Sequence, residues 1–209
     1  HRAAHANHAI APLDDRPIVC IGDSLTSFGR AGGYPEVLAT MISAPVVNLG
    51  QPGITSAEAL KQLPALRAAR PQAVVIELGG HDFLKDSSLL KTRSRAETKQ
   101  NLVQFITAAQ KLNAEVVIIE IPRAFFSDPF AGLERELARQ FDLELVADTA
   151  IRELVLYSPY APPGMWTGGP YLSEDGLHPN TRGIELLARH VARALAHLYG
   201  PAVLSKKAP

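Results

Sequence analysis

The sequence predicts one α/β domain with a five-stranded parallel sheet that helices cover on both faces. Two observations predict this class. From residue 17 onward, short β-rich apolar runs alternate with longer segments of helical period, and 209 residues is the length of one domain with a sizeable core. We expect a flexible N-terminal segment over 1–16, the domain over 17–200 and a C-terminal tail over 201–209.

Five short apolar runs are predicted as the strands. Their short, mainly apolar and β-rich character is typical of parallel strands that are buried on both faces. The predicted strands cover 18–21, 45–49, 73–78, 115–121 and 143–147.

Capping residues and apolar stripes predict the helices between the strands. Pro64 interrupts the helical pattern after Thr55, so we expect that segment to be kinked or split into two short helices. The helix starts are marked by Thr55 with Glu58, Ser94 with Glu97, and Asp128 with Pro129. The stripes are Leu102, Phe105, Ile106, Ala109 and Leu112; Leu133, Leu137 and Phe141; and Ile184, Leu187, Val191, Leu195 and Leu198.

The composition excludes several classes of protein. With 46% hydrophobic residues the chain is not intrinsically disordered. Its 21 Lys and Arg balance its 21 Asp and Glu, so no global positive field favours nucleic acid as a partner. The single cysteine, Cys20, excludes an intramolecular disulfide and a thiolate zinc cage. Because it lies within a predicted strand, we expect a buried core thiol and not a nucleophile.

The N-terminal residues leave the compartment open. No apolar run approaches the roughly 18 residues that span a bilayer, and residues 1–15 lack the order of a signal peptide. This opening is either a linker left after a removed targeting segment or anchor, or a plain disordered start. We expect a periplasmic, secreted or membrane-tethered protein in preference to a cytoplasmic one.

Glycine and polar residues follow each of the first three predicted strands, over 22–26, 48–53 and 79–82. Such residues are also common in ordinary turns. However, the ligand site of an open parallel sheet lies beyond the carboxyl ends of its strands. We therefore expect the three loops to meet at one site.

Ser24 has the sequence context of a nucleophile, because it follows a buried strand on a tight turn. A serine hydroxyl needs a histidine to take its proton and an acid to hold the imidazole's tautomer. Asp175 and His178, three residues apart on a loop, can supply both if the turn between them folds back. The alternative is an ordinary turn ahead of the last helix, with Asn180 as its N-cap.

An acyl-transfer site also needs donors aimed at the oxygen that becomes negative. The candidates are the backbone N–H groups of Ser24 and Gly50 and the ring N–H of His81. We expect His190 and His197, beside the apolar stripe of the final helix, to be surface or boundary residues.

These motifs resemble a known family. The segments GDSL (22–25), GGHD (79–82) and DGLHP (175–179), with Gly50 after the first, are similar in order to the four blocks of the SGNH (GDSL) hydrolases. Residues 46–50 and 77–80 are most similar to its thioesterase I, lysophospholipase L1 and arylesterase branch. The resemblance covers nearly the whole chain. It implies a flavodoxin-like three-layer α/β/α sandwich, Ser24 as nucleophile, His178 as base, Asp175 as its orienting acid, and no metal or cofactor.

One position departs from the family pattern, which has asparagine where this chain has His81. A neutral imidazole can donate from Nε2, but it is larger, has two tautomers and can become charged near neutrality. Three outcomes are open: an equivalent donor, an altered substrate preference, or a weakened site.

The leading functional hypothesis is hydrolysis of a small carboxylic ester or thioester through an acyl-enzyme. An alcohol could intercept the same intermediate, which would make the protein an acyltransferase. A catalytically weakened binding domain is the alternative from another class. A flavodoxin-type nucleotide binder is disfavoured, because the first loop lacks a phosphate-cradling glycine series. The sequence does not indicate an oligomeric state.

Several residues are expected around the reacting groups. Asp23 and Asp82, next to the candidate nucleophile and donor, are expected to support the site without touching substrate. The proline-rich, aromatic segment 159–171 either walls the pocket or is a rigid connector with its aromatic side chains on the core. The pocket candidates are Arg123, Phe125, Phe126, Trp166 and Tyr171.

Overall fold

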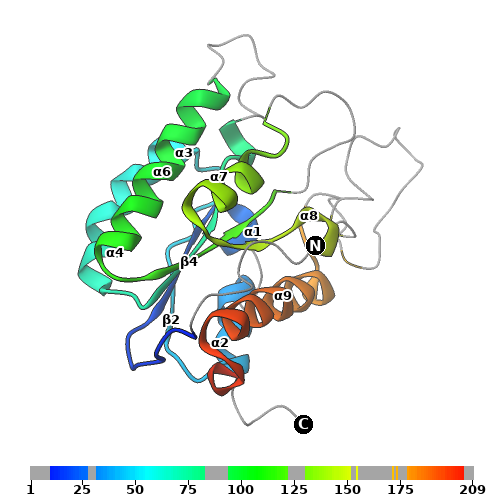
Figure 1. The fold of residues 1–209 in the computed structure, drawn as a ribbon. Coiled ribbons are helices and arrows are strands. Elements are labelled where there is room, and N and C mark those ends of the chain that lie inside the picture. Colours follow the sequence, from blue (N-terminus) through cyan, green and yellow to red (C-terminus); the bar gives the residue numbers. More distant parts are fainter. Residues whose placement is uncertain are drawn as a thin grey trace.

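The computed structural model describes residues 10–27, 32–82, 94–121, 130–151, 154, 171, 173 and 178–204. Its centre is a sheet of five parallel strands in the order β2-β1-β3-β4-β5 (Figure 1). All five predicted strands are confirmed, with bounds that differ by a residue or two. They are β1 (Ile18–Gly22), β2 (Val46–Asn48), β3 (Ala73–Glu77), β4 (Glu115–Ile119) and β5 (Glu144–Val146).

Two apolar cores lie on opposite faces of this sheet. Ile18 and Cys20 of β1 belong to one core, while Val19 and Ile21 belong to the other, because successive strand residues point to opposite faces. The first core is covered by α2 (Tyr34–Met41) and α9 (Thr181–Tyr199), and the second by α4 (Leu63–Ala69), α6 (Arg95–Lys111) and α7 (Leu133–Phe141). Figure 1 shows the resulting three layers, which confirm the predicted fold class.

The helix starts follow the capping residues. Thr55 and Ser94 each form a complete capping box with the glutamate three residues later. The segment around Pro64 is split, as expected, into α3 (Ser56–Ala59), the 3₁₀ helix η1 (Leu60–Gln62) and α4, which has the proline in its first turn. The expected start at Asp128 and Pro129 lies outside the described residues.

The predicted apolar stripes are largely buried. Leu102, Phe105, Ile106 and Ala109 of α6, Leu133 and Leu137 of α7, and all five stripe residues of α9 are buried. Leu112 and Phe141, at the helix ends, are half-buried. The remaining described helices are α1 (Ser24–Ser27), α8 (Asp148–Ile151) and the 3₁₀ helix η3 (Pro201–Val203).

The packed unit extends beyond the expected limits of 17 and 200. The Ala11 N–H donates to the Leu198 carbonyl over 2.8 Å, and the Gln72 side chain donates to the Asp14 carbonyl over 2.7 Å. Leu204 pairs with Ile42 in an antiparallel bridge. These contacts, which sequence periodicity cannot indicate, hold both ends against α9 and its neighbours. Within the described part of the chain, no helix is long and apolar enough to cross a membrane.

Candidate active site

The first loop forms the turn expected of a nucleophile. Strand β1 ends at Gly22, and Ser24 begins α1 one residue after Asp23. The Asp23 carbonyl accepts the Thr26 N–H over 3.2 Å, and its carboxylate Oδ1 accepts the Leu25 N–H over 2.9 Å. The same aspartate thus closes the turn with its backbone and its side chain. Ser24 lies at the carboxyl end of β1 and is 9% exposed.

Glycine is required where this turn leaves the strand. A Cβ atom at Gly22 would lie 1.9 Å from Thr26 Oγ1 and 2.7 Å from the carbonyl oxygen of Glu77. The second of these atoms is backbone of the neighbouring strand β3 and cannot easily move. The turn can therefore pack this closely on β3 only without a side chain at position 22.

The second loop lies directly against this turn. The Gln51 N–H donates to the Gly22 carbonyl over 2.9 Å, and a Cβ at Gly50 would lie 2.8 Å from Thr26 Cγ2. The Gly50 N–H, however, donates to Asn48 Oδ1 over 2.8 Å. An oxyanion would have to compete with that amide oxygen for the donor.

Gly53 offers an unengaged N–H in the same loop. Its φ is 72°, nothing lies within 4 Å of a Cβ built on it, and its N–H makes no hydrogen bond to a described residue. The Gly53 N–H is therefore more available than the Gly50 N–H, which the Asn48 side chain engages. Sequence reasoning could have anticipated it, since asparagine often hydrogen-bonds the backbone two residues on.

The third loop completes the cluster. Gly79 has a φ of 118°, and a Cβ at Gly80 would lie 3.2 Å from Asp23 Oδ2. The His81 ring follows, with Nε2 3.9 Å from the same oxygen. The three loops therefore meet beside Ser24, as predicted.

Asp82 anchors the third loop to two neighbouring helices. It is 1% exposed, its Oδ1 accepts the Ser56 N–H over 2.7 Å, and its Oδ2 accepts the Ser56 and Thr98 hydroxyls over 2.5 and 2.6 Å. These donors belong to α3 and α6. These three hydrogen bonds tie the third loop to α3 and α6.

His178 is brought to the same region from the far end of the chain. Its carbonyl accepts the Ser173 N–H over 2.8 Å, and α9 begins just beyond it, capped by Asn180. Burial raises the pKa of Asp23, while the Leu25 N–H and the charges of His81 and His178 offset part of that rise. Both imidazoles therefore lie within electrostatic reach of the residue that precedes Ser24.

The structure gives less information on the remaining predicted residues. Ser24 makes no hydrogen bond to another described residue, and such contacts are often long in unliganded enzymes. Tyr171 packs on the core, and its ring centroid lies 5.7 Å from the Arg182 guanidinium carbon, which suits the connector alternative. Asp175, Arg123, Phe125, Phe126 and Trp166 lie outside the described residues.

Cys20 and His197, which were not expected to be catalytic, lie where the sequence predicted. Cys20 is buried, and burial raises the pKa of its thiol to about 12, so that no thiolate forms near neutrality. The His197 side chain is 61% exposed and pairs with Glu144 over 2.9 Å. Within the described residues, no three His, Cys, Asp or Glu side chains are grouped so that they could hold a metal ion.

Glu77 is a residue of this site that sequence reasoning missed. It ends β3, is fully buried, and its Oε2 accepts the Asp23 N–H over 3.2 Å and the Thr26 hydroxyl over 3.0 Å. Burial and the neighbouring Asp23 charge raise the pKa of Glu77 well above its usual range. The available signal was a lone acidic residue in an otherwise apolar strand.

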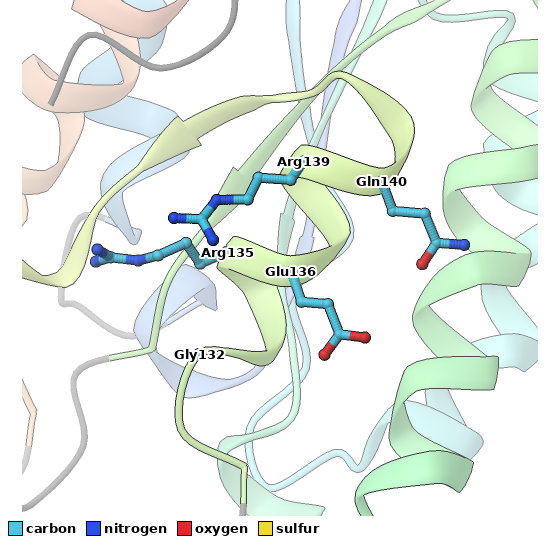
Figure 2. A pocket seen from close by; sticks show the side chains of 5 residues that line it. All are labelled: Gly132, Arg135, Glu136, Arg139 and Gln140. Atoms are coloured by element: carbon cyan, nitrogen blue, oxygen red, sulfur yellow. The ribbon is translucent and has the colours of Figure 1, made fainter.

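A separate surface hollow lies over α7 (Figure 2). Arg135 and Arg139 extend along one side of it, while Glu136 and Gln140 point toward α6. The Arg135 guanidinium donates to Glu120 Oε2 over 2.6 Å and to Asp148 Oδ1 over 3.3 Å. The lining, which also includes Gly132, contains none of the predicted catalytic residues.

Comparison with known proteins identifies the family. Residues 20–186 match the model of the GDSL-like lipase/acylhydrolase family. The chain belongs to this family. The resemblance read from the four sequence blocks is thereby confirmed, and the chain is an esterase that hydrolyses carboxylic esters or thioesters.

Two relatives and one solved structure illustrate the likeness. The chain is 27% identical over 192 residues to Thioesterase 1/protease 1/lysophospholipase L1 of Escherichia coli, a match that covers 87% of this chain and 84% of the relative. It is 31% identical over 176 residues to Esterase TesA of Pseudomonas aeruginosa, covering 78% and 79%. A solved structure of TesA superposes with a TM-score of 0.67 and 26% identity, covering 87% of this chain and 99% of that one.

Proposed function

We propose that this esterase forms an acyl-enzyme on Ser24, with His178 as the general base and Asp175 as the acid that orients it. The observation that carries the proposal is the position of Ser24 on the tight turn after β1, next to Asp23, whose carboxylate lies 3.9 Å from His81 Nε2 and interacts electrostatically with His178.

The proposed reaction has two balanced halves. Ser24 Oγ attacks the carbonyl carbon while its proton passes to His178, and His178 then gives that proton to the departing alcohol or thiol. A water molecule repeats the sequence on the acyl-enzyme, which releases the acid and restores Ser24. In both halves the orienting acid holds the imidazole in the tautomer that presents Nε2 to the serine.

The tetrahedral oxyanion would be stabilised by three donors at the junction of the loops. The Ser24 N–H is at the first residue of α1, where no intrahelical acceptor exists. The second loop contributes a glycine N–H, for which Gly53 is better suited than Gly50, because its N–H is unengaged among the described residues. His81 contributes its ring N–H, the equivalent-donor outcome for the substituted position.

The relatives supply the substrate proposal. One carries the names thioesterase and lysophospholipase, and another the name esterase. We therefore propose small acyl thioesters and lysophospholipid-type esters as the substrate class.

Covalent labelling tests the proposed nucleophile. A fluorophosphonate probe should label the parent protein and should not label Ser24→Ala, which should also lose turnover of an activated ester by on the order of a thousandfold or more. Ser27→Ala is the matched control, since it removes a second hydroxyl from the same short helix. Retained labelling of Ser24→Ala would refute the nucleophile. A panel of acyl-coenzyme A and lysophospholipid substrates then tests the substrate class.

A further inference from the structure

The two oxygen atoms of the Glu77 carboxyl differ in their hydrogen bonding. Its Oε2 accepts two hydrogen bonds, from the Asp23 N–H and the Thr26 hydroxyl, whereas its Oε1 is buried and accepts none among the described residues. A buried carboxylate oxygen without a donor is costly. The cost is removed if that oxygen carries a proton and becomes a donor itself.

An acceptor for this proton is adjacent. Asp23 and Glu77 are both buried, the Asp23 N–H donates to Glu77 Oε2 over 3.2 Å, and the two carboxyl groups interact electrostatically. Two ionised carboxylates have only acceptors, so a hydrogen bond between them exists only when one of them is protonated. Asp23 is the member better suited to the charge, because it accepts the Leu25 N–H and lies near two imidazoles.

We propose that Glu77 is a positioning residue that holds one proton and donates it in a hydrogen bond to the Asp23 carboxylate. This hydrogen bond fixes the Ser24 turn and leaves the pair of carboxyl groups with a single negative charge next to the oxyanion site. Glu77 then contacts the turn at three points: the Asp23 side chain, the Asp23 N–H and the Thr26 hydroxyl. The inference rests on the proposed role of Ser24.

The proton matters for charge as well as for geometry. The tetrahedral oxyanion forms next to the Ser24 turn, so a second buried carboxylate there would oppose it in a medium of low dielectric constant. With Glu77 neutral, the pair contributes one negative charge, which His81 and His178 face. Loss of the proton at alkaline pH would add a second negative charge and remove the hydrogen bond to Asp23.

The titratable groups of the pair and around it come from several parts of the fold. Asp23 belongs to the nucleophile turn, and His81 and His178 belong to the loops after β3 and before α9. Behind Glu77, the Tyr34 hydroxyl of α2 and the Cys20 thiol of β1 are buried, and the hydroxyl makes no hydrogen bond to a described residue. Burial raises the pKa of Tyr34, so this side presents neutral groups.

Two substitutions at position 77 distinguish a role for the proton of Glu77 from a role in packing alone. Glu77→Gln keeps a donor toward Asp23 and an acceptor for Thr26, so kcat near pH 7 should stay within about threefold of the parent. Glu77→Ala should lower kcat by roughly ten- to a hundredfold, with KM changed much less. The alkaline fall of kcat due to Glu77 should be absent in Glu77→Gln. Glu144→Gln, which changes a buried strand glutamate facing His197, is the control and should keep the parent's pH profile.

Infrared difference spectroscopy tests the proton without relying on activity or on the alanine variant folding. The parent at neutral pH should show the C=O stretch of a protonated carboxyl, sensitive to deuterium, that Glu77→Gln lacks and Glu144→Gln retains. Absence of that band in the parent overturns the proposal, as does an equal loss of kcat in Glu77→Gln and Glu77→Ala. If Ser24→Ala kept its activity while the band was present, the proposed nucleophile would fail and the carboxyl pair would stand.

Discussion

His81 Nε2 lies 3.9 Å from Asp23 Oδ2, so the residue that departs from the family pattern faces the residue that precedes the nucleophile. This separation is too long for a hydrogen bond. The imidazole can therefore direct its N–H to a substrate oxygen, while the carboxylate favours the tautomer that keeps a proton on Nε2. This relationship supports His81 as a donor that replaces the family's asparagine.

Substitution of His81 should slow acylation. If the imidazole donates to the oxyanion, His81→Ala should lower the acylation rate by on the order of a hundredfold, with little change in substrate binding. His81→Asn should recover much of the loss, because the requirement is an N–H at that point. Stopped-flow acylation with an activated ester measures both, and thermal melts control for folding. An unimpaired His81→Ala would make His81 a packing or substrate-selecting residue.

Replacement by asparagine should have different effects at Asp175 and at Asp82. Asp175→Asn should lower kcat by on the order of a thousandfold by favouring the wrong His178 tautomer. Asp82→Asn should instead lower the free energy of unfolding by about 2 kcal/mol, because an amide cannot accept all three hydrogen bonds from Ser56 and Thr98. Urea unfolding and kcat per folded molecule separate the effects. Full activity in Asp175→Asn would require another acid.

The fold was largely predictable because its signals are local. Short, mainly apolar runs marked all five strands, and Pro64 marked the split before α4. The limits at 17 and 200 were set too narrowly, since the contacts of Ala11 and Leu204 are made with residues distant in sequence.

The residues that support the site were harder to predict, because most of their contacts join residues that are distant in sequence. Glu77 contacts Asp23 only because β1 and β3 are adjacent, in a register that pairs Gly22 with Glu77, and these residues are 54 or more positions apart. Periodicity identifies strands but does not give their order. The Asn48 bond to Gly50 spans two residues and was accessible from the sequence, whereas the environment of Asp82 required the packing of α3 and α6.

Replacement of Gly22 should disrupt both stability and activity. Gly22→Ala places a methyl group against the Glu77 carbonyl, so we expect a loss of about 3 kcal/mol in the free energy of unfolding, together with loss of esterase activity. Gly132→Ala is the control: its φ is 75° but its surroundings are open, and it should cost about 1 kcal/mol with activity retained. Urea unfolding and ester hydrolysis measure both. Equal losses of unfolding free energy in Gly22→Ala and Gly132→Ala would show that the close approach of Glu77 does not exclude a side chain at position 22.

The ion cluster of Arg135 should make stability depend on pH. Burial raises the pKa of Glu120, but the hydrogen bonds from Arg135 and from the Asp148 N–H, with the Arg135 charge, outweigh it and lower the pKa overall. A carboxyl whose pKa is lower in the folded state contributes stability that is complete above its unfolded pKa, about 4.3. That contribution is lost as the pH falls through the lower, folded value.

Arg135→Met should therefore destabilise the protein most near neutrality. We expect a loss of about 2 kcal/mol at pH 7 that shrinks below about pH 4, because there Glu120 is increasingly protonated in the parent as well. Arg139→Met is the matched control, since Arg139 lies one turn further along α7 and makes no ion pair with a described residue (Figure 2). Urea unfolding of the three proteins between pH 3 and about pH 8 measures the difference. If Arg135→Met and Arg139→Met gave the same pH profile, the Glu120 contact would contribute nothing specific, and the anchoring of α7 to the ends of β4 and β5 would rest on apolar packing alone.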